Sequence, residues 1–99
     1  MVNKNIISEK KLEKCLSNEV KALGGWSIKL PAYIVRGLPD RLLLMPGARA
    51  YFAEIKTTGE DLTPVQKLVR SKIEALGFKV FKIDSDEALS LTIKSITQN

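Results

Sequence analysis

Two short apolar runs around a turn constrain the fold of this chain more than any other feature. The runs cover residues 42–45 and 50–55, each about the length of a strand, and Pro46-Gly47 lies between them. Because a Pro-Gly dipeptide is a turn signal, the pattern predicts a β-hairpin. If the loop is the three residues 46–48, the register places Asp40 opposite Glu54, on one face at the open end of the hairpin.

The open end of this hairpin is expected to collect three charged side chains. Residues two apart on a strand point to the same face, so Lys56 joins Asp40 and Glu54 there. Two adjacent carboxylates repel each other and are costly to bury, so they require a positive partner. Mg²⁺ meets this requirement, because one or two carboxylates plus substrate phosphates commonly hold it. The alternative is a salt-bridge network at a strand edge, since Glu-x-Lys is a common tripeptide in exposed strands.

The elements around the hairpin predict an α/β fold in one domain spanning residues 1–99. Both faces of the hairpin carry apolar side chains, so helices are expected to cover the sheet on both sides. A capping box opens the second expected helix, which is expected to pack with the apolar stripe Val65, Leu68, Val69, Ile73 and Leu76. Helices are expected over 8–23, 63–76 and from 84 or 85 onward, and further strands over 26–30 and 78–83.

Composition limits the chemistry that the chain can perform. The sequence contains no histidine, which excludes Ser-His-Asp and Cys-His machinery and histidine-rich zinc sites. A single cysteine, Cys15, excludes an internal disulfide and is expected to pack in a helix. The net charge of +5 agrees with a polyanionic partner. Without a membrane-length apolar run or a secretory signal, the chain is expected to be cytoplasmic, with no membrane partner and no organic cofactor.

Gly-Leu-Pro-Asp at 37–40, followed by Glu-Ile-Lys at 54–56, resembles the PD-(D/E)xK nuclease pattern in its small stand-alone VRR-NUC form. The resemblance extends from about residue 9 to residue 84. It implies a restriction-endonuclease-like core of order αβββαβα with a mixed sheet. It also implies a Mg²⁺- or Mn²⁺-dependent phosphodiesterase in which Asp40, Glu54 and the backbone carbonyl of Ile55 hold metal, while Lys56 serves the attacking water.

The same resemblance implies a helix glutamate and a glutamine at the site. Glu13 matches the spacing of the family's helix acid, and on a helical wheel it lies about 20° from Val20 in the apolar stripe. The alternative for Glu13 is a surface ion pair with a neighbouring lysine, and Glu9 is the second choice for the helix acid. Gln66 has two interpretations. Its side chain either accepts from the backbone N–H of the N-cap residue, as in a capping box, or lies near the metal and the scissile phosphate.

Candidate DNA contacts lie around this site. Arg36 belongs to the loop that leads into Asp40, where a neighbouring aromatic residue, Tyr33, either stacks on an unpaired base or packs against the protein. Cations at a helix start favour phosphate because backbone N–H groups there also bind it. The four cations assigned to DNA contact are Lys29, Arg36, Lys67 and Arg70, although the pattern around Lys29 favours an ordinary exposed strand lysine.

The expected function is a metal-dependent DNA endonuclease in a bacterial cell or a phage-infected host. It is expected to prefer branched or junction DNA. No sequence-specific readout element is visible. One chain offers one site, so cutting two strands requires a homodimer. The competing hypothesis is a catalytically inactive nucleic-acid-binding or partner-docking module on the same scaffold. Nicking and restriction-like roles, and one or two metal ions, are also compatible with the sequence.

Overall fold

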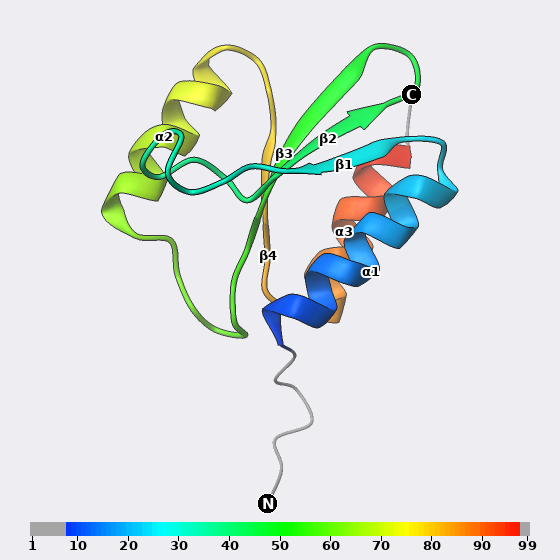
Figure 1. Ribbon diagram of the computed structural model, residues 1–99, viewed down its shortest axis with the longest axis horizontal. Helices are drawn as coiled ribbons and strands as arrows, with labels where there is room; N and C mark the ends of the chain where they lie inside the picture. The colour runs from blue at the N-terminus through cyan, green and yellow to red at the C-terminus, as the bar shows by residue number, and fades with distance from the viewer. Residues whose placement is uncertain (1–7, 98–99) are drawn as a thin grey trace, which may run out of the picture.

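A computed structural model describes residues 8–97 and shows a four-stranded sheet with helices on both sides (Figure 1). The order of elements is αβββαβα, as the sequence predicted. In chain order they are α1 (Glu9–Ala22), β1 (Trp26–Lys29), β2 (Arg41–Met45), β3 (Arg49–Ile55), α2 (Pro64–Ala75), β4 (Val80–Ile83) and α3 (Asp86–Thr97).

The sheet has the order β1-β2-β3-β4, with β1–β2 and β2–β3 antiparallel and β3–β4 parallel. The predicted hairpin register is confirmed, because Met45 faces Arg49 and Leu42 faces Phe52. The three-residue loop closes with Gly47 at φ 83° and Ala48 at φ 60°. Glycine adopts this left-handed region without strain, and it is open to alanine only as a single residue in a tight turn.

The hydrophobic core lies between the sheet and the pair α1 and α3, which lie side by side on one face (Figure 1). The α1 helix begins at its N-cap Ser8, whose side chain accepts a hydrogen bond from the backbone N–H of Lys11. Cys15 packs against this core, as expected. Burial of each large aliphatic side chain stabilises the fold by about 1.5–3 kcal/mol. The largest buried aliphatic side chains there are Leu12, Leu16, Leu43, Ile83 and Ile96.

The opposite face of the sheet is covered only in part. The α2 helix lies there alone (Figure 1) and contacts the sheet chiefly at β4. The expectation that α2 packs with all five residues of its apolar stripe is wrong, because Leu68 is 58% exposed and Leu76 is 77% exposed. Trp26 on β1 is also exposed, at 66%. Within residues 8–97, no helix combines the length and the apolar character that crossing a membrane requires.

Candidate active site

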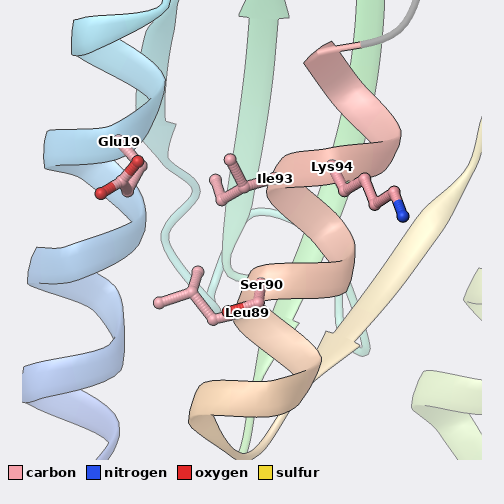
Figure 2. A pocket seen from close by; sticks show the side chains of 5 residues that line it. All are labelled: Glu19, Leu89, Ser90, Ile93 and Lys94. Carbon is pink, nitrogen blue, oxygen red and sulfur yellow. The ribbon is translucent and has the colours of Figure 1, made fainter.

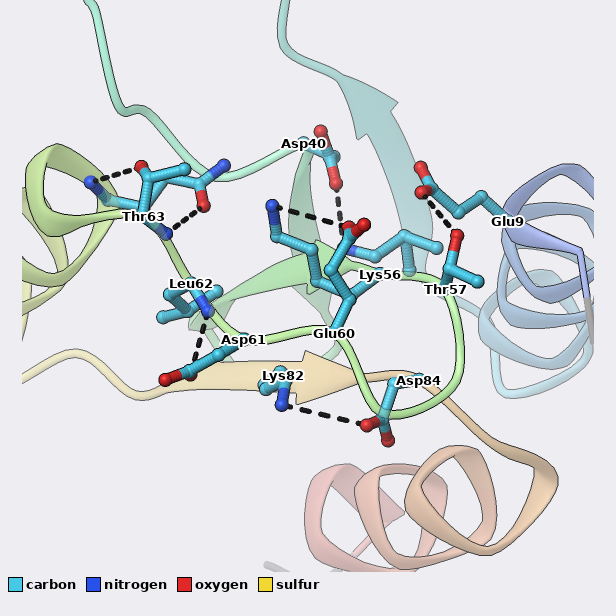
Figure 3. Close-up of polar contacts among 12 residues, drawn as sticks. Glu9, Asp40, Lys56, Thr57, Glu60, Asp61, Leu62, Thr63, Lys82 and Asp84 are labelled. Atoms are coloured by element: carbon cyan, nitrogen blue, oxygen red, sulfur yellow. Dashed lines mark hydrogen bonds and ion pairs between the residues drawn. The ribbon is translucent and has the colours of Figure 1, made fainter. Parts of the chain in front are cut away.

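Asp40 lies immediately before β2, and hydrogen bonds to its backbone and to its side chain fix its position. Its backbone carbonyl accepts a hydrogen bond from the N–H of Leu30 at 2.7 Å, and the preceding Pro39 is fully buried. The Asp40 side chain accepts a second hydrogen bond, from the backbone N–H of Ile55 at 2.6 Å. The carboxylate therefore sits at the open end of the β2–β3 hairpin, beside the end of β3 (Figure 3).

Gly37 explains how the chain reaches Asp40. Its φ is +86°, and a Cβ atom at this position would lie 2.7 Å from the backbone carbonyl oxygen of Val65 in α2. Both the backbone conformation and the close approach to α2 therefore require glycine. The sequence marks Gly37 only as part of the Gly-Leu-Pro-Asp motif, and its contact with α2 gives the physical reason for the glycine.

Glu54 is the only charged side chain that is buried in the described part of the chain, with 3% exposure. Its pKa is raised from 4.5 to about 8, chiefly by burial and then by the hydrogen bond with Asp40 and the negative charge of Asp40. Glu9 adds a smaller contribution in the same direction, while Lys56 opposes the rise. Near neutral pH the acid pair therefore retains a proton, which a divalent cation of the right size would displace.

Lys56 directly follows β3 and lies beside Glu54. Its backbone N–H donates to the carbonyl of Ile83 at 2.9 Å, which continues the parallel pairing of β3 and β4 beyond the strand end. Its side chain is 12% exposed, and Nζ lies 3.8 Å from Oε1 of Glu60 (Figure 3). The structure thus brings Asp40, Glu54 and Lys56 together, as the hairpin register predicted.

This donor set fits a hard divalent cation. No group of three Asp, Glu, Cys or His side chains able to hold a metal ion exists among residues 8–97. Two carboxylates and a backbone carbonyl are nevertheless typical for Mg²⁺, which keeps several waters and takes its remaining ligands from substrate phosphates. Asp40 and Glu54 are the carboxylates that could fill this role, together with the carbonyl of Ile55, whose N–H the Asp40 side chain already binds.

The two candidate helix acids of α1, Glu9 and Glu13, have different surroundings. Oε2 of Glu13 lies 3.2 Å from Nη2 of Arg41 and 3.7 Å from Nζ of Lys29. These two cations face each other in the β1–β2 register, on the face that α1 covers. Glu9 instead accepts a hydrogen bond from the Thr57 hydroxyl at 3.0 Å (Figure 3), and its charge raises the pKa of Glu54. Glu9 is therefore the α1 acid in the electrostatic environment of Glu54.

Gln66 forms the capping box that the sequence predicted. Its side-chain oxygen accepts from the backbone N–H of Thr63 at 2.9 Å, and the Thr63 hydroxyl accepts from the N–H of Gln66 at 3.2 Å. These bonds fix the start of α2. The capping interpretation of Gln66 is confirmed, and its place near the metal and the scissile phosphate stays a prediction.

The cations expected to contact DNA differ in their exposure and in their ion-pair partners. Arg36 is exposed in the loop before Asp40, and Lys29 is 66% exposed. Lys67 pairs with Asp61 at 3.0 Å, and Arg70 pairs with Glu74 at 3.4 Å. Exposed ion pairs of this kind are weak, so a phosphate can replace the carboxylate partner.

Two hollows lie away from the acid pair. One, of about 330 Å³, lies between α1 and α3 (Figure 2), where Leu89 and Ile93 reach toward α1. The other, of about 390 Å³, is lined by residues of α1 and β1 that include Trp26. Neither hollow is lined by Asp40 or Glu54. The candidate site is therefore identified by its charges and hydrogen bonds and not by a deep pocket.

Two further residues that contribute to the site region had no assigned role from the sequence. Arg41 donates a hydrogen bond to Glu13. Strand alternation could have predicted the direction of its side chain, because neighbouring residues of a strand point to opposite faces and Arg41 follows Asp40 directly. Glu60 pairs with Lys56 across a loop, where no periodic pattern predicts contacts.

Comparisons with known proteins agree with this geometry. No family model matches the sequence. A protein described as "Putative nuclease p44", from Acyrthosiphon pisum secondary endosymbiont phage 1, is 37% identical over 86 residues, which cover 87% of this chain and 92% of that protein. A solved structure described as "VRR_NUC domain" matches with a TM-score of 0.81 and 26% identity, covering 87% of this chain and 94% of its own. The chain belongs to the VRR-NUC family of nucleases.

Proposed function

We propose that this nuclease is a metal-dependent DNA endonuclease whose reaction centre is formed by Asp40, Glu54 and Lys56. The observation that carries the proposal is the buried carboxyl of Glu54, which lies against Asp40 with its pKa raised to about 8. A buried acid pair of this kind is unfavourable as a purely structural element. It is favourable where a divalent cation neutralises it.

The metal ligands in this proposal are Asp40, Glu54 and the backbone carbonyl of Ile55. The Lys56 N–H, which belongs to the same peptide group as the Ile55 carbonyl, donates to the Ile83 carbonyl at 2.9 Å and so fixes the orientation of that group. Glu9 is assigned as the helix acid in place of Glu13, because Arg41 and Lys29 already neutralise Glu13. Mg²⁺ or Mn²⁺ bound there supplies activation of water and neutralises charge that develops on the phosphate.

Lys56 supplies the positive charge next to the reacting phosphate. Its side chain is largely shielded from water, so its charge is screened less than that of an exposed lysine. Its partner Glu60 is 54% exposed, and the 3.8 Å ion pair is weak enough to yield to a water or a phosphate oxygen. Lys56 can therefore orient the nucleophile and stabilise negative charge in the transition state.

The proposed substrate is DNA, with a preference for branched or junction structures. The net charge of +5 supports binding to the phosphate backbone, and no sequence-reading element was predicted. A homodimer would bring two sites to two strands. Exposed apolar side chains on the α2 side of the sheet, Leu68, Leu76 and Phe78, support such an assembly. Sedimentation equilibrium at micromolar concentration tests it, and a monomer mass would contradict it.

Cleavage assays test the proposed activity. A four-way junction and a linear duplex are incubated with the protein in Mg²⁺, with Ca²⁺ as the non-catalytic control. The proposal predicts cutting in Mg²⁺ and binding without cutting in Ca²⁺. Lys56→Met is expected to bind DNA and to cut about 100-fold more slowly, whereas Lys94→Met, an exposed lysine on α3, is expected to match the parent. Binding without cutting by the parent, in Mg²⁺ and Mn²⁺ alike, would favour the inactive binding module.

A further inference from the structure

Three consecutive large side chains in the loop between β1 and Asp40 face solvent. Tyr33 is 88% exposed, Ile34 is 59% exposed and Val35 is 48% exposed. We call residues 31–36 the apolar loop. A run of exposed apolar residues is unfavourable on an ordinary surface and usually marks a contact with a partner.

The apolar loop is held in a defined conformation. The hydrogen bond from the Leu30 N–H to the Asp40 carbonyl joins the two ends of the segment, at 2.7 Å. Within it, the N–H of Ile34 donates to the carbonyl of Pro31 at 3.2 Å, which forms a turn. Gly37 then packs against Val65 of α2. The exposed apolar side chains are therefore presented on a fixed support that ends at Asp40.

The charge around the apolar loop favours a polyanionic partner. Residues 30–39 contain no acid, and Arg36 follows the apolar side chains directly. Lys29, which precedes the segment, is 66% exposed and pairs with Glu13 at 3.7 Å, an exposed ion pair weak enough for phosphate to compete with it. An aromatic side chain flanked by cations is the arrangement that binds single-stranded nucleic acid, with the ring on a base and the cation on a phosphate.

We infer that the apolar loop inserts beside an unpaired base next to the scissile phosphate, with Tyr33 stacking on that base and Arg36 on the adjoining phosphate. This inference rests on the proposed function, because it takes the phosphate at Asp40 as the one that is cut. It specifies the substrate class as DNA with unpaired or unstacked bases at the cleavage position. Ile34 and Val35 keep the neighbouring base step apart, as apolar wedges do in other DNA complexes.

Binding measurements with a fluorescent base test the inference. The probes are a duplex with a three-nucleotide bulge that carries 2-aminopurine and a fully paired duplex of the same length, both in Ca²⁺. The parent is expected to quench the probe and to prefer the bulge. Tyr33→Ala is expected to lose about tenfold in affinity for the bulge and little for the duplex. Tyr33→Phe keeps the ring and is expected to behave like the parent.

The matched control is Leu91→Ala, because Leu91 is an exposed apolar residue of α3 with 62% exposure. It is expected to bind both probes like the parent. The inference is overturned if Tyr33→Ala binds both probes like the parent or weakens both equally. It is also overturned if Tyr33→Ala changes the sedimentation mass, because the loop would then be a contact between two copies. Quenching without cleavage in Mg²⁺ would instead refute the proposed activity and leave the stacking contact in place.

Discussion

The Asp40 carboxylate accepts a hydrogen bond from the backbone N–H of Ile55 at 2.6 Å, across the open end of the hairpin. This bond joins the segment that follows β1 to the last residue of β3. Its geometry depends on the hairpin register, because a shift by one residue would move Glu54 to the other face of the sheet. The three-residue turn that sets the register is therefore part of what assembles the site.

The raised pKa of Glu54 predicts how stability depends on pH without metal. In the unfolded chain the carboxyl ionises near pH 4.5, whereas in the folded protein it keeps its proton until about pH 8. Between these values the folded state binds more protons than the unfolded state, so the free energy of unfolding falls as pH rises. Urea unfolding between pH 5 and pH 8 in chelator measures the slope.

Glu54→Gln removes this titration and is expected to flatten the slope. Glu87→Gln, which changes an exposed acid of α3, is expected to keep the slope of the parent. An equal slope in the parent and in Glu54→Gln would contradict the assignment. Added Mg²⁺ is expected to stabilise the parent more at pH 8 than at pH 6, because the ion competes with the proton.

Glu9 and Glu13 provide a matched pair for identifying the helix acid. Glu9→Gln is expected to slow cleavage about tenfold with little change in stability, because Glu9 contributes to the electrostatics of Glu54. Glu13→Gln is expected to lower the free energy of unfolding by about 1 kcal/mol, because Arg41 loses a charged partner, and to keep the rate of cleavage. Cleavage rates and urea unfolding of both variants check this. The reverse pattern would restore Glu13 as the acid of the site.

Alanine substitutions at Gly37 and Gly59 distinguish the cost of backbone strain from the cost of steric crowding. Both have φ above +80°, so alanine at either position costs about 1–2 kcal/mol from the backbone alone. At Gly37 the new Cβ would also meet the Val65 carbonyl at 2.7 Å, whereas at Gly59 it meets nothing within 4 Å. Gly37→Ala is therefore expected to lose about 1–3 kcal/mol more than Gly59→Ala. It should also slow cleavage, because Asp40 shifts. Equal losses in urea unfolding would show that the close approach to α2 is unimportant.

Local signals explain why much of this fold could be predicted from the sequence. The Pro46-Gly47 turn fixed the hairpin, and alternation along its strands then placed Asp40 and Glu54 on one face. The caps at Ser8 and Thr63 fixed the helix starts for the same reason, since each depends on residues only three positions apart.

Non-local packing explains what the sequence could not predict. The apolar stripe of α2 indicates which side of the helix is apolar. It does not indicate how much of the sheet lies beneath the helix, so the exposure of Leu68 could not be predicted. Glu9 and Glu13 lie one turn apart on α1. Only the position of Arg41 on the neighbouring strand shows that Glu13 is already neutralised.

Cleavage by Asp40→Asn tests the central claim most directly. Asparagine keeps an oxygen that can accept the Ile55 N–H, so the fold should be retained while one metal-binding charge is lost. In Mg²⁺ we expect the rate of cleavage of the four-way junction to fall at least about 100-fold, with unfolding in urea close to that of the parent. A folded Asp40→Asn protein that cuts at the rate of the parent would contradict the assignment of this acid pair as the reaction centre.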